Sequence, residues 1–293
     1  MRLSLHCETV ETLPALQSFP GEVSYLYCAM RINQMPTVYF KGRVLPAPVQ
    51  ISFTDIPQVE KWVWQEAGMT LEFVIRITNS QVEVECKLDR YQNDYMGEIH
   101  RRAFDLARAC VNVAAFSTGL GVIVFFDEFI GPDGVSHPLV LASPHVVAEC
   151  TAFKMNPVTL EEKKNLGAIL ALVMLEPAIF MALNDLIQAI STPHMAPANC
   201  GRVLDGLRKL VAPDMDPKQG WPIFQKVINV DEPYLTFISE HSKEPRHGGH
   251  IRIDGPTTME ISRRTWAIMN RFLEFRKRGN LPLPVAEFPI LNG

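Results

Sequence analysis

The chain has 293 residues, of which 47% are hydrophobic and 20% are charged. These proportions are ordinary for a globular protein and argue against intrinsic disorder. The formal net charge of −4 excludes the class of generally basic proteins that coat nucleic acid. The length is enough for one large domain or for two modest domains, each with its own core.

Cysteine usage and the N-terminus together predict a cytoplasmic protein. The six cysteines are scattered without a Cys-x-x-Cys pair, which is typical of buried thiols rather than of metal ligands. The N-terminus turns acidic and polar within its first residues, so no signal peptide is predicted. We also predict no membrane association. The apolar stretch from Leu166 to Leu183 is interrupted by Glu176 and Pro177, and we interpret it as a buried helix.

Alternation with a period of two predicts an antiparallel hairpin over residues 71–88. Apolar and charged residues alternate over 71–77 and again over 82–88, and the polar residues 78–80 separate the two runs. Prolines separate the weaker strand candidates at 23–30, 37–44 and 48–53. Residues 56–68 fit either a short helix or another strand.

The period changes to that of a helix after Tyr95. Apolar residues recur at helical spacing as far as Ser117, and beyond Ala103 almost every face is apolar, so we expect a largely buried helix packed on the sheet. Strands are predicted at 120–126 and 139–141. Residues 1–155 are therefore predicted to form an α+β domain, in which one long helix covers a mostly antiparallel sheet.

Strand signals stop after Asn156-Pro157, and residues 156–293 are predicted to form a helical bundle with an extended C-terminal tail. One apolar helix should cover 167–190, with a kink at Pro177. Glu176 lies inside it, and since an isolated buried carboxylate is costly we expect it to meet a basic partner or a helix end. The remaining helices are predicted from residue 159, at 199–211, 221–230 and 234–241, and at 258–279; the proline-rich tail, 280–293, should dock on a surface groove.

A short polar island at residues 239–250 is the strongest candidate for a functional site. It holds three of the eight histidines, an arginine and two glycines. Histidine titrates near neutral pH, and the planar guanidinium of arginine binds phosphate or carboxylate. Arg246, His247 and His250 are therefore the candidate catalytic residues.

These three residues resemble the motif of the HEPN domains, small helical bundles found in many prokaryotic toxins and defence proteins. The family signature is an arginine, usually followed by Asn, Asp or His, and then a histidine after four to six intervening residues. Arg246 followed by His247 fits this signature, whereas His250 comes after only three intervening residues. The resemblance covers at most the C-terminal half of the chain.

The resemblance implies an RNA-directed protein of bacterial stress or defence type, with metal-independent ribonuclease activity and no cofactor. His250 would act as a general acid or base on the RNA, with His247 in support. Arg246 would stabilise the charge that grows on the phosphate. In such domains the site is commonly built across a dimer, so the resemblance also implies a homodimer formed by the helical half. Nothing in the sequence indicates DNA.

Three alternatives remain open for the polar island. His241, His247 and His250, with a carboxylate from Glu240 or Glu244, have a spacing that a turn could gather around Zn²⁺. The arginine could instead cap helix carbonyls beside histidines on a solvated loop. The third alternative is a non-enzymatic ligand- or partner-binding or sensing protein, in which the β-rich half recognises the ligand or partner and the helical half dimerises.

Overall fold

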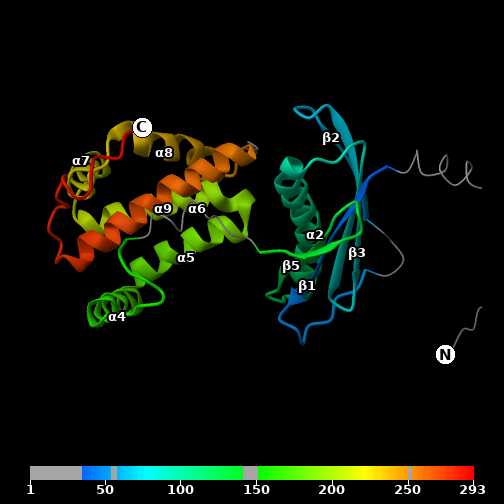
Figure 1. Cartoon of the computed structure of the whole chain (residues 1–293), viewed down its shortest axis with the longest axis horizontal. Helices are drawn as coiled ribbons and strands as arrows, with labels where there is room; N and C mark the ends of the chain where they lie inside the picture. Colours follow the sequence, from blue (N-terminus) through cyan, green and yellow to red (C-terminus); the bar gives the residue numbers. More distant parts are fainter. Residues whose placement is uncertain (1–34, 54–57, 141–150, 250–252) are drawn as a thin grey trace, which may run out of the picture.

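The computed structural model describes residues 35–53, 58–140, 151–249 and 253–293 (Figure 1). An N-terminal sheet carries a long helix on one face, and a C-terminal bundle of helices follows. The predicted α+β fold class is confirmed. In Figure 1 the helix of the N-terminal half, α2, lies between the sheet and the bundle, so it faces both.

The sheet has six strands in the order β2-β3-β4-β1-β5-β6, and every neighbouring pair is antiparallel. The segment 56–68, which fitted either a helix or a strand, contains β2. The prediction of a strand at 48–53 is wrong. The candidate at 23–30 lies outside the described residues. The strands are β1 (Thr37–Leu45), β2 (Gln58–Trp64), β3 (Met69–Thr78), β4 (Gln81–Leu88), β5 (Ile123–Ile130) and β6 (Ser136–Pro138).

The predicted hairpin is β3–β4, paired from Leu71↔Leu88 to Thr78↔Gln81. Its two turn residues, Asn79 and Ser80, have φ values of 49° and 63°. Two successive residues with positive φ are the signature of the tight turn whose twist matches that of the strands. The buried Ser80 hydroxyl donates to the Val49 carbonyl and accepts from the Ile51 amide, so the turn also holds the segment that follows β1.

Helix α2 (Met96–Thr118) covers one face of the sheet and ends at Gly119, which has a φ of 68°. Ile99, Ala103 and Ala107 of its sheet-facing side are fully buried. The expectation that the helix is largely buried is wrong for its last turns, where Phe116 is 92% exposed. Apolar residues occupy every face there, and a single sheet can cover only one face of a helix.

The C-terminal half is a bundle built around α6 and α9, which contact each other and most of the other helices. Among the described residues of this half, the only β pairing is an isolated bridge between Val230 and Leu291. The elements are α4 (Leu160–Leu175), α5 (Pro177–Ser191), the 3₁₀ turn η2 (Pro193–Met195), α6 (Ala196–Val211), α7 (Pro217–Ile228), α8 (Glu232–Arg246) and α9 (Gly255–Lys277).

The predicted apolar helix of residues 167–190 is broken into α4 and α5, which meet at an angle of 103°. Pro177 begins α5, a position where its missing N–H costs nothing. Glu176 precedes it as N-cap and pairs with Arg276 of α9, so the expected basic partner is confirmed. The expected burial is wrong for α4, in which only Ile169 is buried.

Within the described residues, no single helix is long and apolar enough to cross a membrane, although the bent pair α4–α5 passes that test by length and composition.

The tail docks on the bundle, as expected. Leu283 is 3% exposed, and the Asn229 side chain donates to the carbonyls of Leu283 and Phe288, at 2.8 and 3.0 Å. Arg271 of α9 donates to the Pro289 carbonyl at 2.6 Å. The tail is therefore anchored on the helical half through Leu283 and these backbone contacts, while most of its residues are exposed.

Candidate functional site

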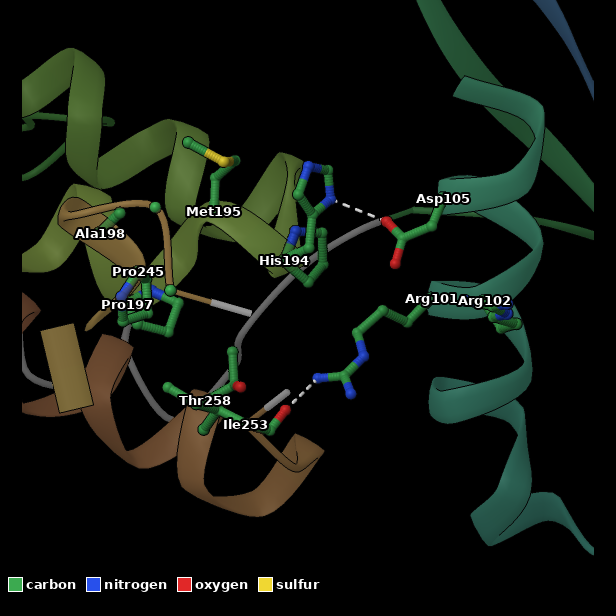
Figure 2. A pocket seen from close by; sticks show the side chains of 13 residues that line it. Arg101, Arg102, Asp105, His194, Met195, Pro197, Ala198, Pro245, Ile253 and Thr258 are labelled. Carbon is green, nitrogen blue, oxygen red and sulfur yellow. Dashed lines mark hydrogen bonds and ion pairs between the residues drawn. The ribbon is translucent and has the colours of Figure 1, made fainter. Parts of the chain in front are cut away.

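A cleft of about 610 Å³ lies between α2 of the N-terminal half and the helical bundle (Figure 2). Helix α2 contributes Arg101, Arg102 and Asp105 to one wall. The opposite wall comes from η2, the start of α6, the turn after α8 and the start of α9. The volume falls in the range of sites for small ligands.

Helix α2 presents one polar face to the bundle because Glu98, Arg101 and Asp105 are spaced by three and four residues. Arg101, whose side chain is 9% exposed, reaches across the gap and donates from Nη1 to the Ile253 carbonyl at 2.7 Å (Figure 2). Its Nη2 also lies 3.3 Å from the Glu98 carboxylate. A Cβ on Gly255 would lie 2.6 Å from that carboxylate, so a glycine permits this close approach.

The second bridge across the cleft joins the side chains of Asp105 and His194. His194 Nδ1 lies 2.8 Å from Asp105 Oδ1, and each side chain is about one-third exposed. Figure 2 shows the imidazole pointing from η2 toward α2. Arg102, on the neighbouring face of α2, pairs with Glu60 of β2. The cleft is thus lined by two guanidinium groups and one imidazole against a single carboxylate.

The turn after α8 forms part of the wall with little side-chain bulk. Gly248 has a φ of 82°, a conformation that favours glycine, and the Gly249 amide donates to the Glu244 carbonyl at 2.8 Å. Pro245 precedes these glycines, and all three residues line the cleft. Part of the polar island predicted from the sequence therefore reaches the cleft through its backbone turn.

His100, next to Arg101 in sequence, faces the sheet. Its ring lies 5.5 Å from Phe40 and 5.9 Å from Phe126, between centroids. Burial lowers its pKa to about 4, and the charge of Asp105 opposes this shift only in part. Its Nε2 has no hydrogen-bond partner among the described residues. At neutral pH His100 is therefore an uncharged core residue.

The predicted catalytic residues are not all placed together in the cleft. Arg246, the last residue of α8, pairs with Asp205 of α6, and its side chain is 25% exposed. His247 caps the C-terminus of α8 and is exposed. Neither residue is among those that line the cleft, and His250 lies outside the described residues. Sequence reasoning missed Arg101, Arg102, Asp105 and His194, although the spacing of Glu98, Arg101 and Asp105 carried a signal.

In the alternative of a zinc site, the first of the three histidines, His241, is already in contact with a backbone carbonyl. His241 Nδ1 lies 2.7 Å from the Phe237 carbonyl, and its ring packs at 4.6 Å from the Phe237 ring. In the part of the chain that the structure describes, no three His, Cys, Asp or Glu side chains are grouped so that they could hold a metal ion.

Comparisons with known proteins place the cleft between two recognised regions. Residues 38–140 match the N-terminal domain, and residues 166–277 the C-terminal domain, of one family of unknown function, DUF8168. No match to this chain was found among curated proteins or among solved structures. Arg101, Arg102 and Asp105 lie in the first matched region and His194 in the second. The chain belongs to the DUF8168 family, and it carries both domains of that family.

Proposed function

We propose that the protein is a non-enzymatic binding module that holds a small anionic ligand in the cleft between its two halves. The observation that carries this proposal is a cleft of ligand size whose lining includes the guanidinium groups of Arg101 and Arg102 and a single carboxylate, that of Asp105. Guanidinium groups bind carboxylate and phosphate through paired N–H donors, which makes an anion the ligand class that fits best.

Arg101 is placed to respond to such a ligand. Its two contacts, with the Ile253 carbonyl and the Glu98 carboxylate, use fewer donors than the five N–H groups that a guanidinium offers. The cleft is partly shielded from water, so charge-assisted hydrogen bonds formed there are stronger than on an open surface.

Ligand binding in this cleft would report on the arrangement of the two halves. Each wall belongs to a different half, and Asp105–His194 and Arg101–Ile253 are direct bridges between them. An anion that pairs with Arg101 or Arg102 competes with those bridges or adds to them. The ligand would then change the relative orientation of sheet and bundle, which is the physical basis of a sensor.

The test is calorimetric titration of the full chain with inorganic phosphate, a nucleoside monophosphate and succinate. We expect at least one of these anions to bind, and Arg102→Gln and His194→Gln to weaken that binding at least tenfold. Arg43→Gln is the matched control, because Arg43 pairs with Asp127 on the face of the sheet away from α2. The proposal fails if no anion binds, or if Arg43→Gln weakens binding as much as the cleft variants do.

A second candidate is RNA cleavage of the HEPN type, with Arg246 and His250 as the central residues and His247 in support. One observation favours it: Pro245, Gly248 and Gly249 of the same island line the cleft. Arg101 and Arg102 line the same cleft and would bind the phosphate backbone of an RNA there. Arg246 would first have to exchange Asp205 for a phosphate, which a partly exposed ion pair allows.

Incubation of the full chain with labelled total RNA in EDTA tests this second candidate. Cleavage that Arg246→Ala and His250→Ala both abolish, in variants of unchanged thermal stability, is the expected result. Lys243→Ala is a control on the exposed surface of the same helix. Intact RNA with the wild type, or equal cleavage by both variants, excludes the ribonuclease and leaves the anion-binding proposal standing.

A further inference from the structure

Helices α4 and α5 carry a cluster of exposed apolar side chains, which we name the elbow face. Its members are the large apolar residues close to the bend between the two helices that are more than half exposed. In α4 these are Leu170 (53%), Met174 (81%) and Leu175 (78%); in α5 they are Phe180 (55%) and Met181 (53%). The two helices contact each other and are joined at Glu176, so the cluster runs across the bend between them.

The elbow face is a second apolar stripe rather than the edge of the core. In α4, exposed residues at 167, 170, 171 and 174 follow the spacing of one helix face. Ile169, on the other side, is 4% exposed and belongs to the core. Helix α4 therefore joins the bundle through one apolar face and directs a second apolar face at solvent. Such a helix is typical of an interface.

Electric charge is almost absent from this region. Between residues 166 and 183 the only charged side chain is Glu176, and its charge is compensated by Arg276 of the same chain. A two-fold contact brings one surface against its own copy, so an uncompensated charge near the axis would meet its like. The elbow face is free of that repulsion, which makes pairing with itself favourable.

The exposed area also suits a dimer. Five large apolar side chains that are half to four-fifths exposed offer on the order of 400–600 Å² of apolar surface, at roughly 100–200 Å² per full side chain. A standard interface buries about 800 Å² on each partner, of which rather more than half is apolar. The elbow face therefore supplies about the apolar area that one side of a standard interface needs.

A lipid surface fits the elbow face less well. Helices that lie on membranes carry many Lys and Arg residues on their polar side. At the start of α4 the bases Lys163 and Lys164 are balanced by Glu161 and Glu162. In α5 the single charged residue, Asp185, is paired with Arg202 of α6. Neither helix presents the net positive charge that would attract anionic lipid.

We propose that the elbow face binds the same face of a second copy of this chain and so forms a two-fold homodimer. The dimer is a different one from that implied by the HEPN resemblance. In Figure 1 α8, which carries Arg246, lies on the far side of α6 and α9 from α4. Pairing through the elbow face leaves both polar islands and both clefts accessible, away from the two-fold axis.

The mass of the full chain in solution tests this proposal, measured by light scattering after gel filtration and by sedimentation velocity. We expect the wild type at micromolar concentration to have twice the 33.0-kDa mass of one chain. Met174→Glu should shift the protein to the mass of one chain, because the new carboxylate would meet its like across the axis. Met174→Leu, which restores the apolar contact, should remain dimeric.

Phe116→Glu is the matched control, because Phe116 is an apolar side chain that is 92% exposed on α2, away from the elbow face. It should remain dimeric, and circular dichroism should show that all variants are folded. A monomeric wild type, or a Met174→Glu variant that stays dimeric, overturns the proposal. A monomer that binds phosphatidylglycerol vesicles in flotation, and loses this binding in Met174→Glu, would assign the face to lipid instead.

Discussion

Helices α4 and α9 show that apolar composition and burial are different properties. Between Gly167 and Leu175 helix α4 has no charged residue, yet Ile169 is its only buried one. More than half of the residues of helix α9 are buried, although it contains seven charged residues: Glu260, Arg263, Arg264, Arg271, Glu274, Arg276 and Lys277.

The positions of the two helices in the bundle explain why α9 is buried and α4 is exposed. Helix α9 contacts α4, α5, α6, α7 and α8, so its neighbours cover most of its surface, whereas α4 contacts α5 and α9. The polar groups of α9 are buried because they have partners. Arg271 donates to the carbonyls of Ile228, Asn229 and Pro289, and Asn270 accepts from the amides of Thr151 and Ala152. The surplus apolar surface on α4 is the observation behind the proposed dimer.

A matched pair of truncations gives the largest test of this comparison. Phe272→Ala removes a fully buried ring from α9 and should lower the free energy of unfolding by about 3–5 kcal/mol. Leu175→Ala in α4, where the side chain is 78% exposed, should change it by less than about 0.5 kcal/mol in dilute solution. Urea titration measures both values, and similar losses in the two variants would contradict the comparison.

A buried polar group without a partner should make stability depend on pH. His100 has a pKa of about 4 in the folded protein and about 6.5 when unfolded. The unfolded chain binds the extra proton, so the stability that neutral His100 provides is complete above pH 6.5 and is lost as pH falls toward 4.

The loss between these pH values should be about 2–3 kcal/mol, from the size of the pKa shift. His100→Phe keeps an aromatic ring among Phe40, Phe104 and Phe126 and should remove this part of the pH dependence. Urea titrations of both proteins at pH 7 and pH 5 isolate the effect, because the carboxylates titrate alike in the two. If the free energies of unfolding of the two proteins changed with pH in the same way, His100 would not be the cause of the pH dependence.

The third test compares a buried arginine of α6, which lacks some hydrogen-bond partners, with a buried arginine of α9 that has them. Arg208 is 4% exposed and stacks over Trp221, but its Nε and Nη1 have no hydrogen-bond partner among the described residues. Replacing a poorly partnered buried charge with an apolar side chain of similar length often stabilises a protein. We expect Arg208→Met to raise the free energy of unfolding by about 1–2 kcal/mol, whereas Arg271→Met should lower it.

The thermal midpoints of the two arginine variants give the sign directly. A destabilised Arg208→Met protein would mean that the contact with Trp221 outweighs the cost of burying the charge.

The smallest effect is expected at the surface of α4. Met174→Ser should leave the free energy of unfolding of the single chain within about 0.5 kcal/mol of the wild type, because the side chain is 81% exposed. The same variant should weaken dimerisation, so its thermal midpoint should stop rising with protein concentration. A large loss of stability in dilute solution would instead place Met174 in the core.

Local periodicity predicted the elements that depend on local rules. The alternation over 71–88 and the polar turn at Asn79-Ser80 define a hairpin without reference to the rest of the chain. The burial of α4 and of the end of α2 was not predictable in this way, because apolar residues on several faces say that a helix has contacts but not which ones. Only the assembled bundle shows which face remains open.

The cleft was harder to predict than the fold because its walls come from distant parts of the sequence. Asp105 and His194 meet across the two halves, and Arg101 ends on the carbonyl of Ile253. Each is an ordinary polar residue in its own segment. The polar island is conspicuous in the sequence because three histidines lie within ten residues of one another. In the structure, however, Arg246 is paired with Asp205, and the part of the island that lines the cleft is Pro245 with the glycine turn.

The position of β1 in the sheet has a consequence for how the chain folds. This strand, Thr37–Leu45, pairs with β4 and β5, so its neighbours end at residues 88 and 130. The β3–β4 hairpin needs only a two-residue turn and can form first, whereas placing β1 requires closure of much longer loops. Until β1 is inserted, β4 exposes an unpaired edge, and that interval is when the nascent sheet is most open to pairing with another chain.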